Sequence, residues 1–144
     1  MYRNILIPTD GSELAEKAVA HGLRLAKAVG AKVTGVTVSE PFPHYAAPND
    51  IEYARADYQK ETDALSAKAL SAVAAAAERA GVACKTLHVE QGQVHRAILD
   101  AAAGEGCDLI LMASHGRHGV AALILGSETQ KVLTHSTIPV LVCR

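Results

Sequence analysis

Two periods of apolar residues alternate along the chain. Short apolar runs such as Ile5–Ile7 and Leu109–Met112 are typical of strands buried on both faces of a sheet. Longer segments between them repeat apolar residues at the 3.6-residue spacing of a helix. The pattern predicts strands at 5–7, 32–38, 82–89, 109–112 and 140–143, and helices at 13–29, 51–79, 93–103 and 127–134.

Strands and helices alternate, with connections too long for hairpins. This order predicts an α/β fold, with a five-stranded, parallel, doubly wound sheet and helices on both faces, Rossmann-like. The 144 residues suit a single domain spanning 1–144. Ligands of such sheets bind beyond the carboxyl ends of the strands, so Asp10 and residues 113–116 are candidates for the binding crevice.

Capping residues and one helix face can also be predicted. Ser12 is the expected N-cap of the first helix, and Gly30 is expected to end it. The helix at 51–79 is rich in alanine, and small residues on its buried face indicate a close approach to the sheet. The face expected to be buried holds Leu65, Ala69, Ala72, Val73 and Ala76.

Composition and charge exclude several classes of partner. The formal net charge is −1, so neither nucleic acid nor a membrane surface is an expected partner. Three cysteines without a C-x-x-C motif suit free thiols in a reducing compartment. The N-terminus lacks the apolar segment of a signal peptide, so we expect a soluble, cytoplasmic protein.

The stretch 108–131 carries the main candidate chemistry. A strand, a glycine-bearing loop and a helix start follow one another there, an arrangement that binds phosphate. Gly116 and Gly126 can adopt positive φ angles, and they leave room for a ligand to approach the backbone. Ser127 can cap the helix or give its hydroxyl to a phosphate. Further donors beside the loop are His115, Arg117 and His118.

Known nucleotide fingerprints of the G-x-G-x-x-G and P-loop types are absent. The spacing Ala113-x2-Gly116-x9-Gly126-Ser127 instead resembles the G-x2-G-x9-G-[ST] loop of the universal stress protein family. The segments I-L-I-P-T-D-G-S, D-L-I-L-M-A-S-H-G and I-P-V-L-V are similar to that family in the same order. Ala113 replaces the first glycine, and its methyl group fits only if this position does not need positive φ.

This resemblance implies the strand order 3-2-1-4-5 and a site for ATP, with Mg²⁺. It places Asp10 near the ribose and adenine, although capping the first helix or satisfying turn amides is the alternative role. The main chain of Val38 would contact the adenine edge. Glu128 would repel a triphosphate unless it points away or helps to hold a metal ion. The expected cofactor-binding residues are Pro8, Thr9, Asp10, Val38, Met112, Ala113, His115, Gly116, Arg117, Gly126, Ser127, Glu128 and Thr129.

The other histidines do not predict a metal centre. They are scattered along the chain, and no cysteine lies near the pair in H-G-R-H, so a zinc site is not expected. His95 is expected on a helix surface.

The functional hypothesis is a nucleotide-dependent stress-response switch. No residue stands out as a base for activating water, so at most slow ATP hydrolysis is expected. The proline-bearing loop at 39–50 could report occupancy to an unknown protein partner. The resemblance also implies a homodimer formed through the last strand, 138–143. The alternative is a non-nucleotide, dimerising interaction or chaperone-like module of the same fold.

Overall fold

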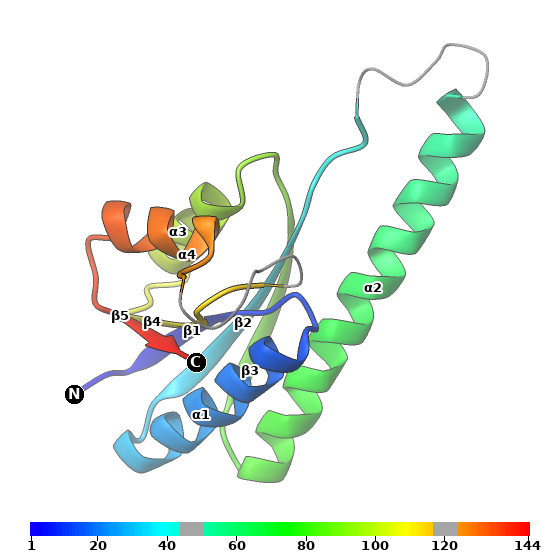
Figure 1. Ribbon diagram of the computed structural model, residues 1–144. Helices are drawn as coiled ribbons and strands as arrows, with labels where there is room; N and C mark the ends of the chain where they lie inside the picture. The colour runs from blue at the N-terminus through cyan, green and yellow to red at the C-terminus, as the bar shows by residue number, and fades with distance from the viewer. Residues whose placement is uncertain (44–50, 117–123) are drawn as a thin grey trace.

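The computed structural model describes residues 1–43, 51–116 and 124–144, and the predicted strands and helices are all present in it (Figure 1). The prediction is two residues early for the start of the third strand and within about one residue elsewhere. In chain order the elements are β1 (Asn4–Pro8), α1 (Glu13–Val29), β2 (Lys32–Ser39), α2 (Ile51–Ala80), β3 (Cys84–Glu90), α3 (Val94–Gly104), β4 (Leu109–Ala113), α4 (Ser127–His135) and β5 (Val140–Cys143).

The five strands form one sheet in the order β3-β2-β1-β4-β5. Every neighbouring pair is parallel. The predicted fold class and strand order are therefore confirmed. The strand order reverses between β1 and β4. The carboxyl ends of β2, β1 and β4 therefore lie side by side at one end of the sheet.

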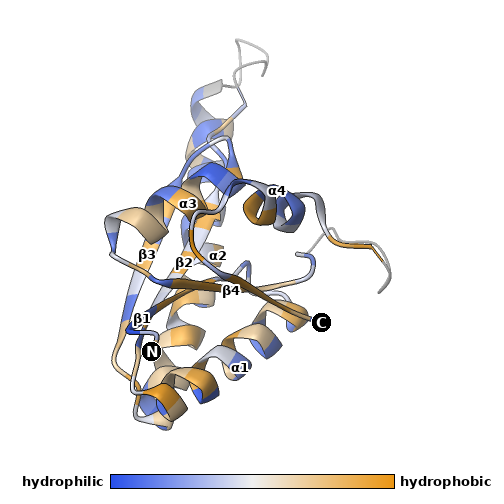
Figure 2. Cartoon of the chain, turned by 90° about the vertical axis from the view of Figure 1, so that its left-hand side faces the viewer, coloured by the Kyte–Doolittle hydropathy of each residue, from blue (hydrophilic) through white to orange (hydrophobic). Residues whose placement is uncertain are grey.

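Helices cover both faces of the sheet. Helices α1 and α2 pack on one face, where Leu23 and Val73 join Ile5 and Leu111 in a buried cluster. Helices α3 and α4 cover the other face, where Ile98 packs with the buried strand side chains that point to that face. Figure 2 shows hydrophobic β4 running between these two layers. The N-terminal part of α2 extends beyond the sheet (Figure 1).

The ends of α1 are as predicted. The Ser12 hydroxyl accepts a hydrogen bond from the Ala15 N–H at 3.2 Å. Gly30 ends the helix in the left-handed conformation, with φ of 74°, which glycine adopts without steric cost.

The predicted buried face of α2 is partly wrong. Ala69 and Val73 are buried, but Leu65 is 51% exposed and Ala72 is exposed. The alanine-rich sequence has no pronounced apolar stripe, so tertiary packing selects the face. A Cβ added to Gly35 would lie 2.9 Å from Val73 Cγ1, which indicates a very close approach of α2 to β2.

A polar cluster fixes the opposite end of the sheet. The Asp108 carboxylate accepts hydrogen bonds from the main-chain N–H groups of Arg3 and Asn4, at distances of 2.9 to 3.1 Å. Partial burial pushes the pKa of Asp108 up, but these N–H donors outweigh it and leave that pKa below its ordinary value. The carboxylate therefore ties the start of β1 to the start of β4.

Across the described ranges, no helix combines the length and apolar character that crossing a membrane requires.

Candidate functional site

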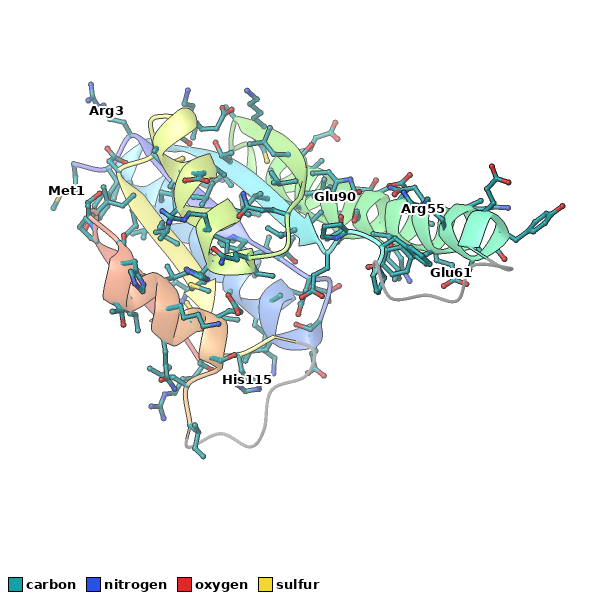
Figure 3. The ribbon with its side chains drawn as sticks, turned by 90° about the horizontal axis from the view of Figure 1, so that it is seen from above. Met1, Arg3, Arg55, Glu61, Glu90 and His115 are labelled. Atoms are coloured by element: carbon teal, nitrogen blue, oxygen red, sulfur yellow. The ribbon has the colours of Figure 1, made fainter. Side chains whose placement is uncertain are left out.

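A cleft of about 570 Å³ lies at the carboxyl ends of β1, β2 and β4, between α2 and α4. Figure 3 shows His115 where β4 gives way to the loop before α4. Twelve of the thirteen predicted site residues line this cleft, and their part in binding stays a prediction. Arg117 and its neighbour His118 lie outside the described residues. The twelve are Pro8, Thr9, Asp10, Val38, Met112, Ala113, His115, Gly116, Gly126, Ser127, Glu128 and Thr129.

Close approach, rather than positive φ, explains the two glycines of the cleft. The described glycines with positive φ are Gly11, Gly30, Gly81 and Gly106, so Gly116 and Gly126 do not use the positive φ that glycine allows. A Cβ on Gly116 would lie 2.7 Å from Asp10 Oδ2, and one on Gly126 would lie 3.0 Å from the Cα of His115. Any side chain at either position would displace its neighbours.

The N-terminus of α4 faces the same cleft. Gly126 is its N-cap and contributes no capping side chain, so Ser127 begins the helix instead of capping it. The Gly126 N–H donates to Ser114 O at 2.7 Å, which fixes the approach of the loop. The first N–H groups of a helix have no intrahelical acceptor, and the helix dipole favours an anion beside them.

Ala113 and Thr129 meet across β4 and α4. Ala113 ends β4, and no described non-glycine residue has positive φ, so the methyl group is accommodated without backbone strain. The Thr129 hydroxyl donates to the Ala113 carbonyl at 3.0 Å. Because this bond uses its only hydrogen, Thr129 can offer an anion its main-chain N–H but not its hydroxyl.

Asp10 holds the turn after β1. Its Oδ1 accepts from the Ser12 N–H at 2.9 Å, and Thr9 Oγ1 accepts from the Gly11 N–H at 3.1 Å. These bonds are typical of turns that follow a strand. The structural role considered for Asp10 is thus present, while Oδ2 lies at the cleft beside Gly116.

The main chain of Val38 lies beyond the end of β1. The Thr9 N–H donates to Val36 O, whereas the Gln91 N–H donates to Ser39 O on the other side of β2. Hydrogen-bonding direction alternates along a strand, so Val38 directs its N–H and C=O to the same side as Val36. Strand β1 ends at Pro8, and these two groups consequently face the cleft.

Glu128 is engaged with α3 and with its own helix. Its Oε2 accepts from the His95 main-chain N–H at 2.9 Å, and its Oε1 lies 3.2 Å from Lys131 Nζ. His95 Nδ1 is 3.4 Å from Oε2, too poorly aligned for a hydrogen bond, since that atom is buried without a partner. Only 18% of the His95 side chain is exposed, so its predicted surface position is wrong.

One wall of the cleft comes from α2 and was not predicted. Tyr58, Thr62, Leu65 and Ser66 line it, at the spacing of one helix face. The Tyr58 hydroxyl donates to Glu40 O at 2.7 Å, which ties α2 to the chain after β2. The sequence carries this spacing, but only the packing of α2 shows that the face borders a cleft.

Among the described residues, the charged side chains that line the cleft are carboxylates. Asp10, Glu40 and Glu128 lie around it. In the part of the chain that the structure describes, no three His, Cys, Asp or Glu side chains group to hold a metal ion. Within the described ranges, the positive potential for an anion comes from main-chain N–H groups and the α4 dipole.

Comparisons with known proteins agree with this geometry. The sequence profile of the Universal stress protein family matches residues 1–144. The chain is 35% identical over 144 residues to the "Universal stress protein in QAH/OAS sulfhydrylase 3'region" of Thermus aquaticus, covering 100% of both chains. The solved structure of hypothetical protein MJ0577 superposes with a TM-score of 0.84 at 30% identity, covering 99% of this chain and 95% of that one.

Two solved universal stress proteins contain adenine nucleotides. One is in complex with cAMP (TM-score 0.71, 22% identity, 99% of this chain and 97% of that one). The other, from Archaeoglobus fulgidus, is in complex with dAMP (TM-score 0.68, 21% identity, 99% and 98%). At these identities the likeness to this chain is one of fold.

Proposed function

Because the chain belongs to the universal stress protein family, we propose that it binds ATP in the cleft and acts as a nucleotide-dependent switch in the stress response. The observation that carries this proposal is the pairing of two features at opposite ends of one cleft. A free main-chain edge lies at Val38, and a glycine-cradled helix N-terminus lies at Gly126. The cAMP and dAMP complexes of proteins with this fold support an adenine nucleotide as the ligand.

The β2 end of the cleft suits adenine. The Watson–Crick edge of adenine offers an amino donor beside a ring-nitrogen acceptor, and the C=O and N–H of Val38 complement that pair. Leu65 of α2 is 51% exposed and supplies apolar surface in the cleft. Burying this side chain against a base would remove apolar area from water.

The β4–α4 end suits phosphate. The N–H groups at the start of α4 bind the phosphate oxygens, and the Ser127 hydroxyl adds a donor. Gly116 and Gly126 keep the backbone free of side chains where the phosphates pass. Asp10, at the end of β1 between the two strand ends, contacts the ribose. Lys131 partly neutralises Glu128, which reduces the repulsion expected from that carboxylate.

Mg²⁺ would accompany the triphosphate. Mg²⁺ keeps several waters and is usually held by phosphates with one or two carboxylates. Asp10 and Glu128 are the carboxylates at this end, which fits an ion that arrives with ATP. The sequence offers no residue that stands out as a base for activating water, so we propose that hydrolysis is at most slow and that occupancy carries the signal.

The signal would reach a protein partner through the rim of the cleft. Tyr58 of α2 packs edge-on against Phe42, with ring centroids 5.5 Å apart, and bonds to Glu40. This cluster joins the cleft wall to the part of α2 that extends beyond the sheet. Residues 44–50, the rest of the predicted reporting loop, lie outside the described residues. Three free thiols suit action in the cytoplasm.

A homodimer through β5 forms part of the proposal. The edges of the sheet are β3 and β5. Strand β3 carries Lys85, His88 and Glu90, whereas β5 reads Val-Leu-Val-Cys. Charged side chains protect an edge from pairing, and an apolar edge favours it. Two-fold pairing of β5 would cover Leu141, which is 38% exposed.

The test starts from purified protein. Denaturation should release an adenine nucleotide, or the empty protein should bind ATP in a titration, more tightly with Mg²⁺ than without. If the folded protein carries no nucleotide and does not bind millimolar ATP, the better explanation is the alternative function, an interaction module that uses no nucleotide.

A further inference from the structure

A histidine outside the cleft contacts the hydroxyls of two serines that line it. Ser39, at the end of β2, and Ser66, on α2, both line the cleft and are 8% and 6% exposed. Both hydroxyl oxygens converge on one atom, Nε2 of His88 on β3, at 2.7 Å and 3.2 Å. His88 itself does not line the cleft, so it acts on a ligand only through the serines.

Either partner of the shorter contact can donate, depending on which ring nitrogen of His88 carries the proton. We assign the ring proton to Nδ1, so that Nε2 accepts from Ser39, and the variants below test this assignment. The Ser39 hydroxyl has one hydrogen, and with that hydrogen used, Ser39 offers the cleft only lone pairs.

The position of these lone pairs matters for base recognition. Ser39 follows Val38, whose main chain faces the adenine edge in the proposed function on which this inference rests. The 6-amino group of adenine has two hydrogens. The Val38 carbonyl accepts one of them, and the second needs another acceptor at the same end of the cleft.

We propose that His88 is a positioning residue that sets base specificity: it holds Ser39 as a hydrogen-bond acceptor for the second amino hydrogen of adenine. A base with an oxo group at the same carbon, such as hypoxanthine, would place the lone pairs of its oxygen against those of the Ser39 hydroxyl, and the two would repel. An unpaired polar group in a buried site is costly, so Ser39 rejects the oxo base as well as binding the amino base.

The experiment compares ATP with ITP, whose bases differ at this position. Equilibrium titration gives the ratio of the two dissociation constants, Kd(ITP)/Kd(ATP), which cancels changes at the phosphates. In His88→Leu, Ser39 regains a free hydrogen that can point at the oxo group. The ratio is then expected to fall about tenfold, the effect of one hydrogen bond, mainly through tighter ITP binding.

Two further variants separate specificity from structure. The amide oxygen of His88→Gln can accept from Ser39, so this variant should keep the ratio within about threefold of the wild type. His21→Leu, on the exposed surface of α1, is the matched control and should not change it. If His88→Leu fails to fold, Ser39→Ala should give the same fall in ratio, but through weaker ATP binding.

Each outcome has one meaning. An unchanged ratio in His88→Leu, or an equal fall in His88→Gln, would overturn the role of His88 while leaving ATP binding intact. Failure of the wild-type protein to bind either nucleotide would instead overturn the proposed function, and this inference with it.

Discussion

Glu128 Oε2 lies 2.9 Å from the main-chain nitrogen of His95, so a residue in the first turn of α4 caps the N-terminal end of α3. The N-cap residue of α3, Gln93, makes no side-chain capping bond, and Glu128 takes that role from a distant part of the chain. The same carboxylate borders the proposed phosphate site, which couples the stability of α3 to ligand binding.

Removing the charge of Glu128 should strengthen binding of ATP. In Glu128→Gln, the amide oxygen can still accept from the His95 N–H, so the loss of folding stability should stay below about 1 kcal/mol. In the absence of Mg²⁺, the affinity for ATP should rise about threefold at low ionic strength, and the affinity for AMP should rise less, because a negative charge near the phosphates is gone. Calorimetric titration measures the affinities for ATP and AMP. Glu78→Gln, at the exposed far end of α2, is the control, and an equal gain for AMP would contradict the electrostatic cause.

A single methyl group at Gly126 should displace the loop that borders the cleft and so weaken nucleotide binding. In Gly126→Ala, the new Cβ would lie 3.0 Å from His115 Cα and 3.3 Å from Ser114 O, and backbone atoms cannot move aside cheaply. We expect at least about a tenfold loss of ATP affinity, with the fold retained by circular dichroism. Gly104→Ala, where a Cβ meets nothing within 4 Å, should bind as the wild type does. Normal binding by Gly126→Ala would place the phosphates elsewhere.

Asp108 should make folding stability depend on acid pH. Its pKa is lower in the folded protein than in the unfolded chain, so its contribution is complete above the unfolded pKa and is lost as the pH falls through the folded value. Asp108→Asn should lose about 1 kcal/mol of unfolding free energy at pH 7 and progressively less below about pH 4. Urea unfolding at both pH values measures this loss. A constant difference would point to packing, and Asp100→Asn on the surface of α3 is the control.

A charge on the β5 edge should prevent dimer formation. Leu141→Lys places an ammonium group on the strand proposed to pair across the two-fold axis, where its desolvation opposes association. We expect sedimentation velocity to show a dimer for the wild type and a monomer for this variant at micromolar concentration. Leu133→Lys changes an equally exposed leucine of α4 (41%) and should remain dimeric. Dissociation of both variants, or of neither, would argue against pairing through β5.

Local sequence patterns predicted the framework of the fold. The apolar runs around Ile5 and Leu109 and the capping residues Ser12 and Gly30 act within a few residues of chain, so the strands, helices and strand order follow from them and from the family resemblance. The loop spacing from Ala113 to Ser127 likewise brought the candidate residues to one cleft.

Long-range packing accounts for the features that the sequence patterns did not predict. The buried face of α2 is set by its close packing against Gly35 of β2. This packing leaves Leu65 on the side of α2 that borders the cleft. Glu128 finds its partner at His95, 33 positions away, which no local spacing can indicate. Gly126 is required by the space around it and not by the positive φ that a glycine can adopt.

Residues of seven elements line the cleft, namely α1, α2, α3, α4, β1, β2 and β4. A molecule seated there would act as an additional piece of core, since anything that binds only the folded chain stabilises it, by about 2.7 kcal/mol at a hundred times Kd. The ligand-bound protein would unfold less often and would be degraded more slowly. Under the proposed function, the lifetime of the protein in the cell would follow the energy charge of that cell.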